Sequence, residues 1–401
     1  GPLVLDFREG PTMVSSLSVN GENISIHAVN EHILIPKKYT RTGENELCLR
    51  FTAGSQSLNR RDEFLYTLLV PDRARTLFPC FDQPDLKANY TLSLSVPEEW
   101  TAISNTYMTD EQTESADRKT IRFAETEPLS TYLFSFVAGK FEEQTAKREG
   151  YPIRVFYREQ DPAKVKQLSK IMDEAGQALH WMENYTGQKD PFEEFGMIIL
   201  PGYQFGGMEH PGRLAFITDG QLWTMNADGT DRRQLSKTDH DLNFLRTYQA
   251  RAMAFDRTEG THPIAQKLGN LNHASLLYDD IVYYKAPVMM RILEEIIGAK
   301  EMQAGLKKYL ETYYFKSASW DDLIETLAQQ VPSIDVRKFS DVWVKQKGMP
   351  LIHTTYKNGE LVVSQTDPFN RGIFWRQKFD VRVINDLGPS RTITIDMTES
   401  E

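Results

Sequence analysis

The eight histidines of this sequence are the first side chains to consider as ligands of a metal. A zinc site on a single helix uses two histidines about one turn apart, because that spacing places both imidazoles on one face. No two of the eight are three or four residues apart: they are His27, His32, His180, His210, His240, His262, His273 and His353. Asp239, His240 and Asp241 are adjacent, and adjacent residues rarely face one ion in a closed site. We therefore predict no metal-ligating residues, and we interpret His262 as a hydrogen-bonded structural histidine.

The first elements expected along the chain, which must help to position any site, are strands. From the start to about residue 140, apolar and polar residues alternate mostly with period two, which predicts half-buried strands. Asn20 and Gly21 both tolerate positive φ, so we expect a tight hairpin there. Individual strands are expected over residues 17–19, 24–26, 47–51, 90–96 and 151–157.

Helical spacing of apolar residues follows the strands. It predicts a helix from Pro162 to about Tyr185, and a short buried strand is expected after it over residues 197–200. Period two returns after Pro350, with Asn358-Gly359 as another hairpin turn. Further helices are expected over residues 242–255, 287–297, 301–314, 320–330 and 336–345, and later strands over residues 361–364 and 379–384.

Composition restricts the classes of partner. The 401 residues carry a formal charge of -10 without a basic stripe, which argues against a nucleic-acid partner. Two cysteines, Cys48 and Cys80, are too few for a disulfide framework and leave the redox compartment undecided. We find neither a run of eighteen apolar residues nor a leader pattern, so we expect a soluble chain with no membrane span and no retained signal peptide. The compartment stays open.

Four segments occur in the order typical of one enzyme family. One of the four is rich in glycine and contains Gly206, Gly207, Met208 and Glu209, followed by His210. The others are Asp72-Arg73-Ala74-Arg75 with Pro79-Cys80-Phe81-Asp82-Gln83-Pro84-Asp85, then Asp256-Arg257-Thr258-Glu259-Gly260-Thr261-His262-Pro263-Ile264, and finally Ile281-Val282-Tyr283-Tyr284-Lys285-Ala286-Pro287.

These segments resemble the aminopeptidase N family of zinc metallopeptidases. The glycine-rich one is similar to its Gly-x-Met-Glu-Asn motif, with His210 in place of Asn. The resemblance implies that Gly206, Gly207, Met208 and Glu209 bind substrate, with the Glu209 carboxylate holding the α-ammonium group of a peptide. It implies that the phenol of Tyr283 stabilises the oxyanion beside the metal.

Two departures from the family pattern concern its chemistry. The resemblance implies a zinc cofactor held by His-Glu-x-x-His and a further Glu, and this sequence contains no such motif. It also places Val70 near the position where the family commonly has a second amine-binding Glu or Gln. The alternative for Glu209 is a solvated or salt-bridged carboxylate, and the alternative for Tyr283 is a core tyrosine.

The segment where the zinc helices would lie has a different pattern. Asp219-Gly220 and Asp228-Gly229 are turn pairs on either side of residues 222–225, which predicts a β-hairpin at about 213–238. The segment looks like one repeat of a TolB-type β-propeller. A propeller needs about four to eight blades, so we interpret the segment as a short replacement.

We expect an α+β multidomain chain. Residues 1–140 are expected to form an N-terminal β-sheet domain that is clipped at its N-terminal end. Residues 141–350 form a thermolysin-like α/β domain that lacks its zinc helices, and residues 351–401 begin a β-sandwich domain. The family's C-terminal helical domain is absent.

The resemblance implies release of N-terminal residues from peptides, but without zinc ligands we predict that the chain as it stands is inactive. Three hypotheses stay open. The chain is an inactive deletion or engineered scaffold, or an active enzyme whose zinc segment is absent from this sequence, which an intact mass well above 46.1 kDa would reveal. The third is a pseudoenzyme that binds peptide N-termini through Glu209.

Overall fold

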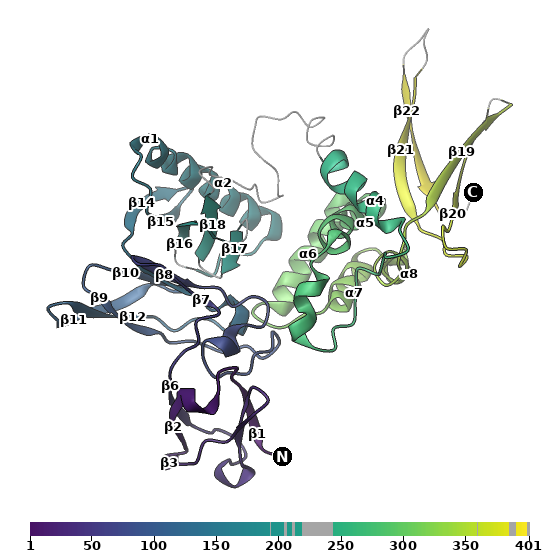
Figure 1. Cartoon of the computed structure of the whole chain (residues 1–401). Coiled ribbons are helices and arrows are strands. Elements are labelled where there is room, and N and C mark those ends of the chain that lie inside the picture. The colour runs from purple at the N-terminus through teal and green to yellow at the C-terminus, as the bar shows by residue number, and fades with distance from the viewer. Residues whose placement is uncertain are drawn as a thin grey trace. The chain divides into compact units, whose positions relative to one another are not determined.

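The computed structural model describes residues 1–192, 194–203, 207–210, 213–218, 244–358, 360–384 and 390–398 (Figure 1). Only the main chain is described at residues 207, 209, 213–218 and 357. The chain forms two compact units, one of residues 1–181 and 189–231 and the other of residues 182–188 and 232–401. The expected division into three domains, with boundaries at residues 140 and 350, differs from these two compact units. That division stays a prediction.

The N-terminal part of the first unit is built from small sheets. Their strand orders are β1-β5-β4, β3-β2-β6, β10-β13-β8-β7 and β11-β12-β9. Asn20 and Gly21 have φ of 52° and 84° between β2 and β3, which confirms the expected turn. The strands are β1 (Leu3–Asp6), β2 (Val14–Val19), β3 (Glu22–Asn23), β4 (Ala28–Val29), β5 (His32–Ile35), β6 (Leu47–Phe51), β7 (Leu58–Arg60), β8 (Phe64–Thr67), β9 (Ser93–Pro97), β10 (Thr101–Ser104), β11 (Met108–Ser115), β12 (Arg118–Phe123) and β13 (Phe136–Gly139).

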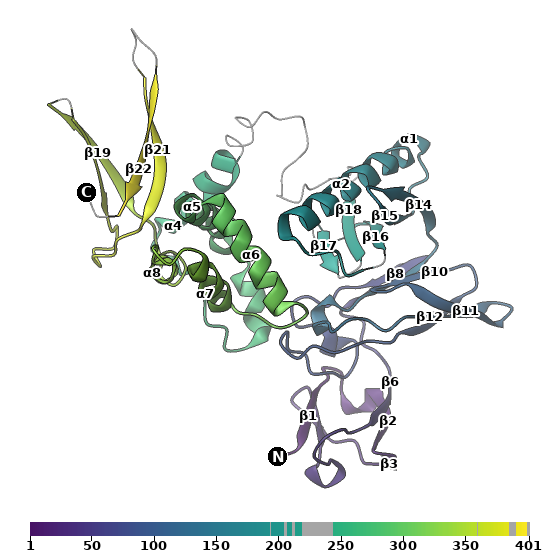
Figure 2. The ribbon, with the colours of Figure 1, turned by 180° about the vertical axis from the view of Figure 1, so that it is seen from behind.

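A five-stranded mixed sheet completes the first unit, with strand order β14-β15-β16-β18-β17. Helix α2 packs on one face of this sheet, and Figure 2 shows the same layer from behind. The elements are β14 (Glu142–Arg148), β15 (Tyr151–Tyr157), α1 (Pro162–Val165), α2 (Leu168–Thr186), β16 (Phe195–Pro201), β17 (Gly207–His210) and β18 (Arg213–Thr218).

The two faces of this sheet have different partners because successive residues of a strand alternate. Val155 of β15 packs toward Met172 of α2. The next residue, Phe156, belongs to the cluster that includes Tyr66 of β8 and Val137 of β13. The four-stranded sheet therefore packs on one face of the five-stranded sheet, and α2 packs on the other face over β15 and β16.

The second unit is mainly helical. Its core contains Leu293, Leu327, Val336, Phe339 and Trp343, all buried. Its helices are the π-helical turns η5 (Leu245–Gln249) and η7 (Ile281–Lys285), the 3-10 segment η6 (Leu271–Leu277), and the α-helices α4 (Ala250–Asp256), α5 (Ala286–Ile297), α6 (Ala299–Tyr313), α7 (Trp320–Gln330) and α8 (Val336–Trp343).

The expected helices are present with two exceptions, of which the first is that the helix expected from Pro162 to about Tyr185 is interrupted between α1 and α2. Helix α7 has the bounds predicted for it and begins with a capping box between Ser319 and Asp322. The predicted α-helix over residues 242–255 was wrong in type at its start, where the described residues form the π turn η5 before α4. A π turn adds one residue to a helical turn, and apolar spacing alone does not reveal the added residue.

Two antiparallel ribbons follow the helices, β19 (Leu351–Lys357) with β20 (Glu360–Thr366) and β21 (Gln377–Val383) with β22 (Arg391–Met397). Asn358 has φ of 52°, as the predicted hairpin requires. The link between the ribbons buries Trp375, whose main chain exchanges hydrogen bonds with the side chain of Gln365 at 2.9 Å. Strands are thus present where they were expected after residue 350, and the β-sandwich stays a prediction.

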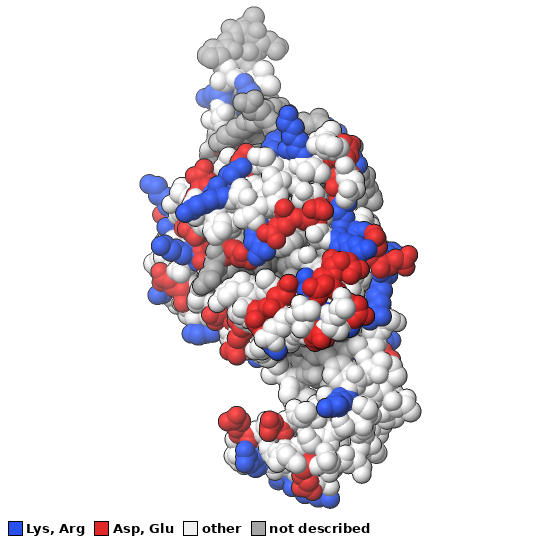
Figure 3. Space-filling view, turned by 90° about the vertical axis from the view of Figure 1, so that its left-hand side faces the viewer, with Lys and Arg blue, Asp and Glu red and all other residues white. Residues whose placement is uncertain are grey.

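The surface agrees with the mixed charge of the sequence. On the face seen in Figure 3, lysine and arginine are interspersed with aspartate and glutamate, and no patch of one sign dominates. None of the helices in the described part of the chain has the length and apolar character needed to cross a membrane.

Asp367 in the C-terminal strands gives a pH-dependent prediction. Burial alone would raise the pKa of its carboxyl, but hydrogen bonds from the Arg371 side chain and from the N–H groups of Phe369 and Arg371 lower this pKa from 3.8 to about 2. A carboxyl with a lowered pKa stabilises the fold above its ordinary pKa, and this contribution is lost as the pH falls through the lowered value.

We expect Asp367→Asn to lower the free energy of unfolding by about 1–2 kcal/mol at neutral pH, because it removes charge-assisted hydrogen bonds. The difference from wild type should shrink as the pH falls from 3.8 toward 2. Urea unfolding followed by tryptophan fluorescence measures both effects, with the exposed carboxylate variant Glu360→Gln as control. A difference that does not change with pH would contradict the account.

Candidate active site

The glycine-rich motif lies on β17, at the edge of the five-stranded sheet. Among the described residues, β17 pairs with β18 alone, with Glu209 opposite Leu214. Gly206 lies outside the described residues, and Gly207 and Glu209 are described in their main chain only. Met208 is buried in the cluster that joins the two sheets. Within the part of the chain that the structure describes, the other edge of β17 has no paired strand.

His210 is the second anchor of this strand. Its side chain is buried, and its Nδ1 lies 3.0 Å from the main-chain oxygen of Leu133, at the end of the 3-10 turn η4 (Thr131–Leu133). Since a carbonyl accepts, this contact requires the proton on Nδ1. The residue that replaces the Asn of the family motif thus binds β17 to the N-terminal sheets.

Tyr283 lies in the π turn η7 of the second unit. The residue is 55% exposed. The adjacent tyrosine differs: the Tyr284 hydroxyl accepts a hydrogen bond of 2.9 Å from Arg251, whose guanidinium also lies over the Tyr284 ring at 4.3 Å. Of the two tyrosines, Tyr283 is the one with an exposed ring.

The predicted site residues fall in different compact units. Glu209 belongs to the first unit and Tyr283 to the second, and the structure describes each within its own unit. Val70, at the position of the family's second amine-binding residue, packs against the same apolar cluster as Met208. A valine offers no group that could bind an ammonium ion.

The described residues do not fit a zinc ion. They contain no group of three histidine, cysteine, aspartate or glutamate side chains placed to hold a metal. The sequence has no pair of histidines at the spacing of a zinc helix. Asp239 to Asp241 and most of the predicted hairpin lie outside the described residues; residues 213–218 of that segment form β18, which pairs with β16 and β17.

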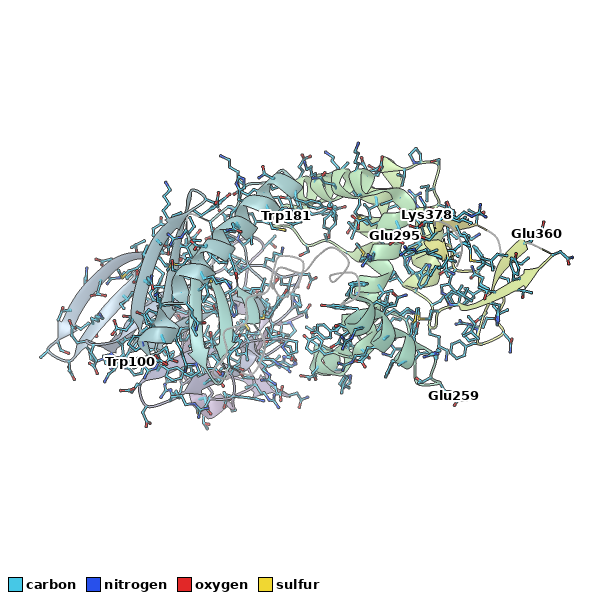
Figure 4. All side chains as sticks on the ribbon, turned by 90° about the horizontal axis from the view of Figure 1, so that it is seen from above. Trp100, Trp181, Glu259, Glu295, Glu360 and Lys378 are labelled. Carbon is cyan, nitrogen blue, oxygen red and sulfur yellow. The ribbon has the colours of Figure 1, made fainter. Side chains whose placement is uncertain are left out.

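One cavity of the second unit was missed by sequence reasoning. It has a volume of about 470 Å³ and lies among η5, α4, α5, β19 and β21. Glu295 of α5 and Lys378 of β21 line it and are labelled in Figure 4. Burial raises the pKa of Glu295, while Arg291 opposes that shift. The lining residues come from separate elements, so no local motif marks them.

The comparisons with known proteins match both parts of the chain. Family models for the Peptidase M1 N-terminal domain and the Peptidase family M1 domain match residues 52–133 and 221–343. Aminopeptidase A of Gloydius brevicauda is 24% identical over 81% of this chain and 39% of its own length. Glutamyl aminopeptidase of Rattus norvegicus is 24% identical over 72% of this chain and 35% of its own length. The probable aminopeptidase 2 of Sulfurisphaera tokodaii is 24% identical over 75% of this chain and 43% of its own length.

The two matched models, on an N-terminal β part and a later helical part, define a multidomain peptidase architecture of the α+β class. The chain belongs to the aminopeptidase N-like family of M1 peptidases. It spans about two fifths of the length of the relatives it matches. Tyr283 lies within the second matched range, and the motif around Glu209 lies between the two ranges.

The anchor at His210 gives a prediction. We expect His210→Ala to lower the free energy of unfolding by about 1 kcal/mol, because the carbonyl of Leu133 loses one of its two side-chain donors and keeps the other, Asn105. His210→Asn keeps an N–H donor and should lose less. Urea unfolding checks this, with the exposed His27→Ala in the same unit as control, and an alanine variant as stable as wild type would disprove the anchor.

Proposed function

We propose that this chain recognises the free N-terminus of peptides, with Glu209 as the residue that binds the α-ammonium group. The observation that supports this most directly is the position of the motif on β17, which is an edge strand among the described residues. A peptide in extended conformation adds to such an edge through main-chain hydrogen bonds, which do not depend on its side chains.

The anchors of β17 support the role of Glu209. Met208 and His210 are both buried on the face of the strand that meets the N-terminal sheets. Glu209 lies between these two anchored residues on β17. When the residues on both sides of a carboxylate are anchored in a strand, that carboxylate loses less conformational entropy on binding an ammonium ion than a carboxylate on a loop does.

We further propose that the chain as it stands does not hydrolyse peptides. In this family, a metal-activated water attacks the scissile carbonyl, and zinc supplies that activation. The sequence lacks the histidine pair that would hold zinc, so we assign this chain binding without hydrolysis. The aminopeptidase relatives favour a second candidate, namely hydrolysis by a longer protein that supplies the zinc segment.

The role of Glu209 is tested by calorimetry on five-residue peptides that begin with Ala, Leu, Arg or Glu. Each is measured with a free and with an acetylated amino group. We expect free peptides to bind and acetylated ones to bind at least tenfold more weakly, because a charge-assisted contact contributes about 1.5–3 kcal/mol. Glu209→Gln should abolish this preference.

The control is Glu98→Gln, which changes an exposed carboxylate of the same unit and should leave the affinity unchanged. Equal binding of free and acetylated peptides would refute recognition of the N-terminus. A Glu209→Gln variant with unchanged preference would move the amine site to other residues.

A further inference from the structure

The cavity of the second unit has walls from two parts of that unit. Residues of η5, α4 and α5 form one wall, and residues of β19 and β21 form the other. Figure 4 labels one residue of each wall, Glu295 of α5 and Lys378 of β21. Pockets that bind small molecules measure about 300–1,000 Å³. The cavity, at about 470 Å³, therefore has the size of a site for a small organic ligand.

Most of the lining is apolar. Val288 of α5 is buried, and Met253 and Ile292 pack against the core of the helices. The strands contribute Ile352 and Phe379 to the same lining. Such a surface favours a ligand with an apolar body, because the removal of that body from water is favourable.

Three charged residues line the cavity, and two of them lie close to each other. Nε of Arg291 lies 3.7 Å from Oε1 of Glu295, one turn further along α5. The Arg291 guanidinium also lies 4.8 Å from the centre of the Phe244 ring. The third charged residue is Lys378. Among the described residues, its ammonium group has neither an ion pair nor a hydrogen bond.

The pairing of β21 with β22 explains why Lys378 has no carboxylate partner there. Lys378 is opposite Asp396, and residues opposite each other in an antiparallel pair are close enough for their charges to interact. Oδ2 of Asp396 instead lies 3.4 Å from Nη2 of Arg376. Lys378 is thus the cation of the lining that an acidic ligand would meet.

We propose that this cavity binds a small monocarboxylate with an apolar body, such as a medium-chain fatty acid. The carboxylate pairs with the ammonium group of Lys378, and the apolar body lies between α5 and the ribbons. This site lies within the second unit and does not involve β17, so the inference goes beyond the proposed function and does not depend on it.

Calorimetry on the full chain compares three ligands with the same apolar chain: decanoate, decanol and decyltrimethylammonium. Each is titrated below the concentration at which it forms micelles. We expect decanoate to bind about tenfold more tightly than the other two, because only a carboxylate forms a charge-assisted contact with Lys378. Bound decanoate should also raise the temperature of unfolding, since it binds the folded state.

Variants of Lys378 test the charge. Lys378→Met should weaken the binding of decanoate about tenfold and leave that of decanol unchanged, because it removes the ammonium group and keeps an apolar side chain. Lys378→Arg keeps a cation and should lose little affinity. The matched control is Lys300→Met, which removes an exposed lysine of α6 outside the lining.

A substitution that fills the cavity tests its location. Ile352 lines the cavity and is 41% exposed, whereas Leu361 of β20 is 42% exposed and lies outside the lining. We expect Ile352→Trp to abolish the binding of decanoate and Leu361→Trp to leave it unchanged. Circular dichroism checks the fold of each variant. Should Ile352→Trp fail to fold, Lys378→Met decides.

The absence of saturable decanoate binding would overturn the proposal. Tighter binding of decyltrimethylammonium would also overturn it, because the ligand would then be a cation that faces Glu295. An unchanged affinity for decanoate in Lys378→Met, or in a folded Ile352→Trp, would place the binding elsewhere. Failure of the Glu209 test would refute the proposed function and leave these results standing.

Discussion

The edge strand β17 depends on the packing of the four-stranded sheet against the five-stranded sheet. Met208 is one of the side chains in that contact, and His210 adds a hydrogen bond to Leu133. Without these two anchors, a four-residue strand at the edge of a sheet would fray. The proposed binding of a peptide main chain and of its ammonium group therefore requires the apolar cluster beneath β17.

The two units hold their candidate residues by different interactions. In the first unit, apolar packing fixes a strand, because a strand presents alternate side chains to the core. In the second unit, η7 is held by the buried Ile281, by hydrogen bonds from its N–H groups to Asp279, and by the ion pair of Lys285 with Asp256. A buried ion pair contributes little net stability, but it restricts the geometry of its partners.

Much of the architecture could be predicted from the sequence. The spacing of apolar residues located α7 and β6, and Asn20-Gly21 located a hairpin turn. The π turns could not be predicted, since apolar spacing alone does not reveal the one added residue. The motif residues pointed to β17, yet the partner of His210 is 77 residues away in sequence, and only the fold brings the two together. Likewise, Lys285 and Asp256 carry no local pattern that marks them as a pair.

The chain thus combines the architecture of a metallopeptidase family with a sequence that contains no His-Glu-x-x-His motif. The most direct measurement is the zinc content of the mass-verified protein after it has been incubated with zinc and dialysed. Our account predicts no retained zinc at an intact mass of 46.1 kDa. About one tightly held zinc ion per chain at that mass would contradict it, because the ligands would then come from residues to which we assign no metal role.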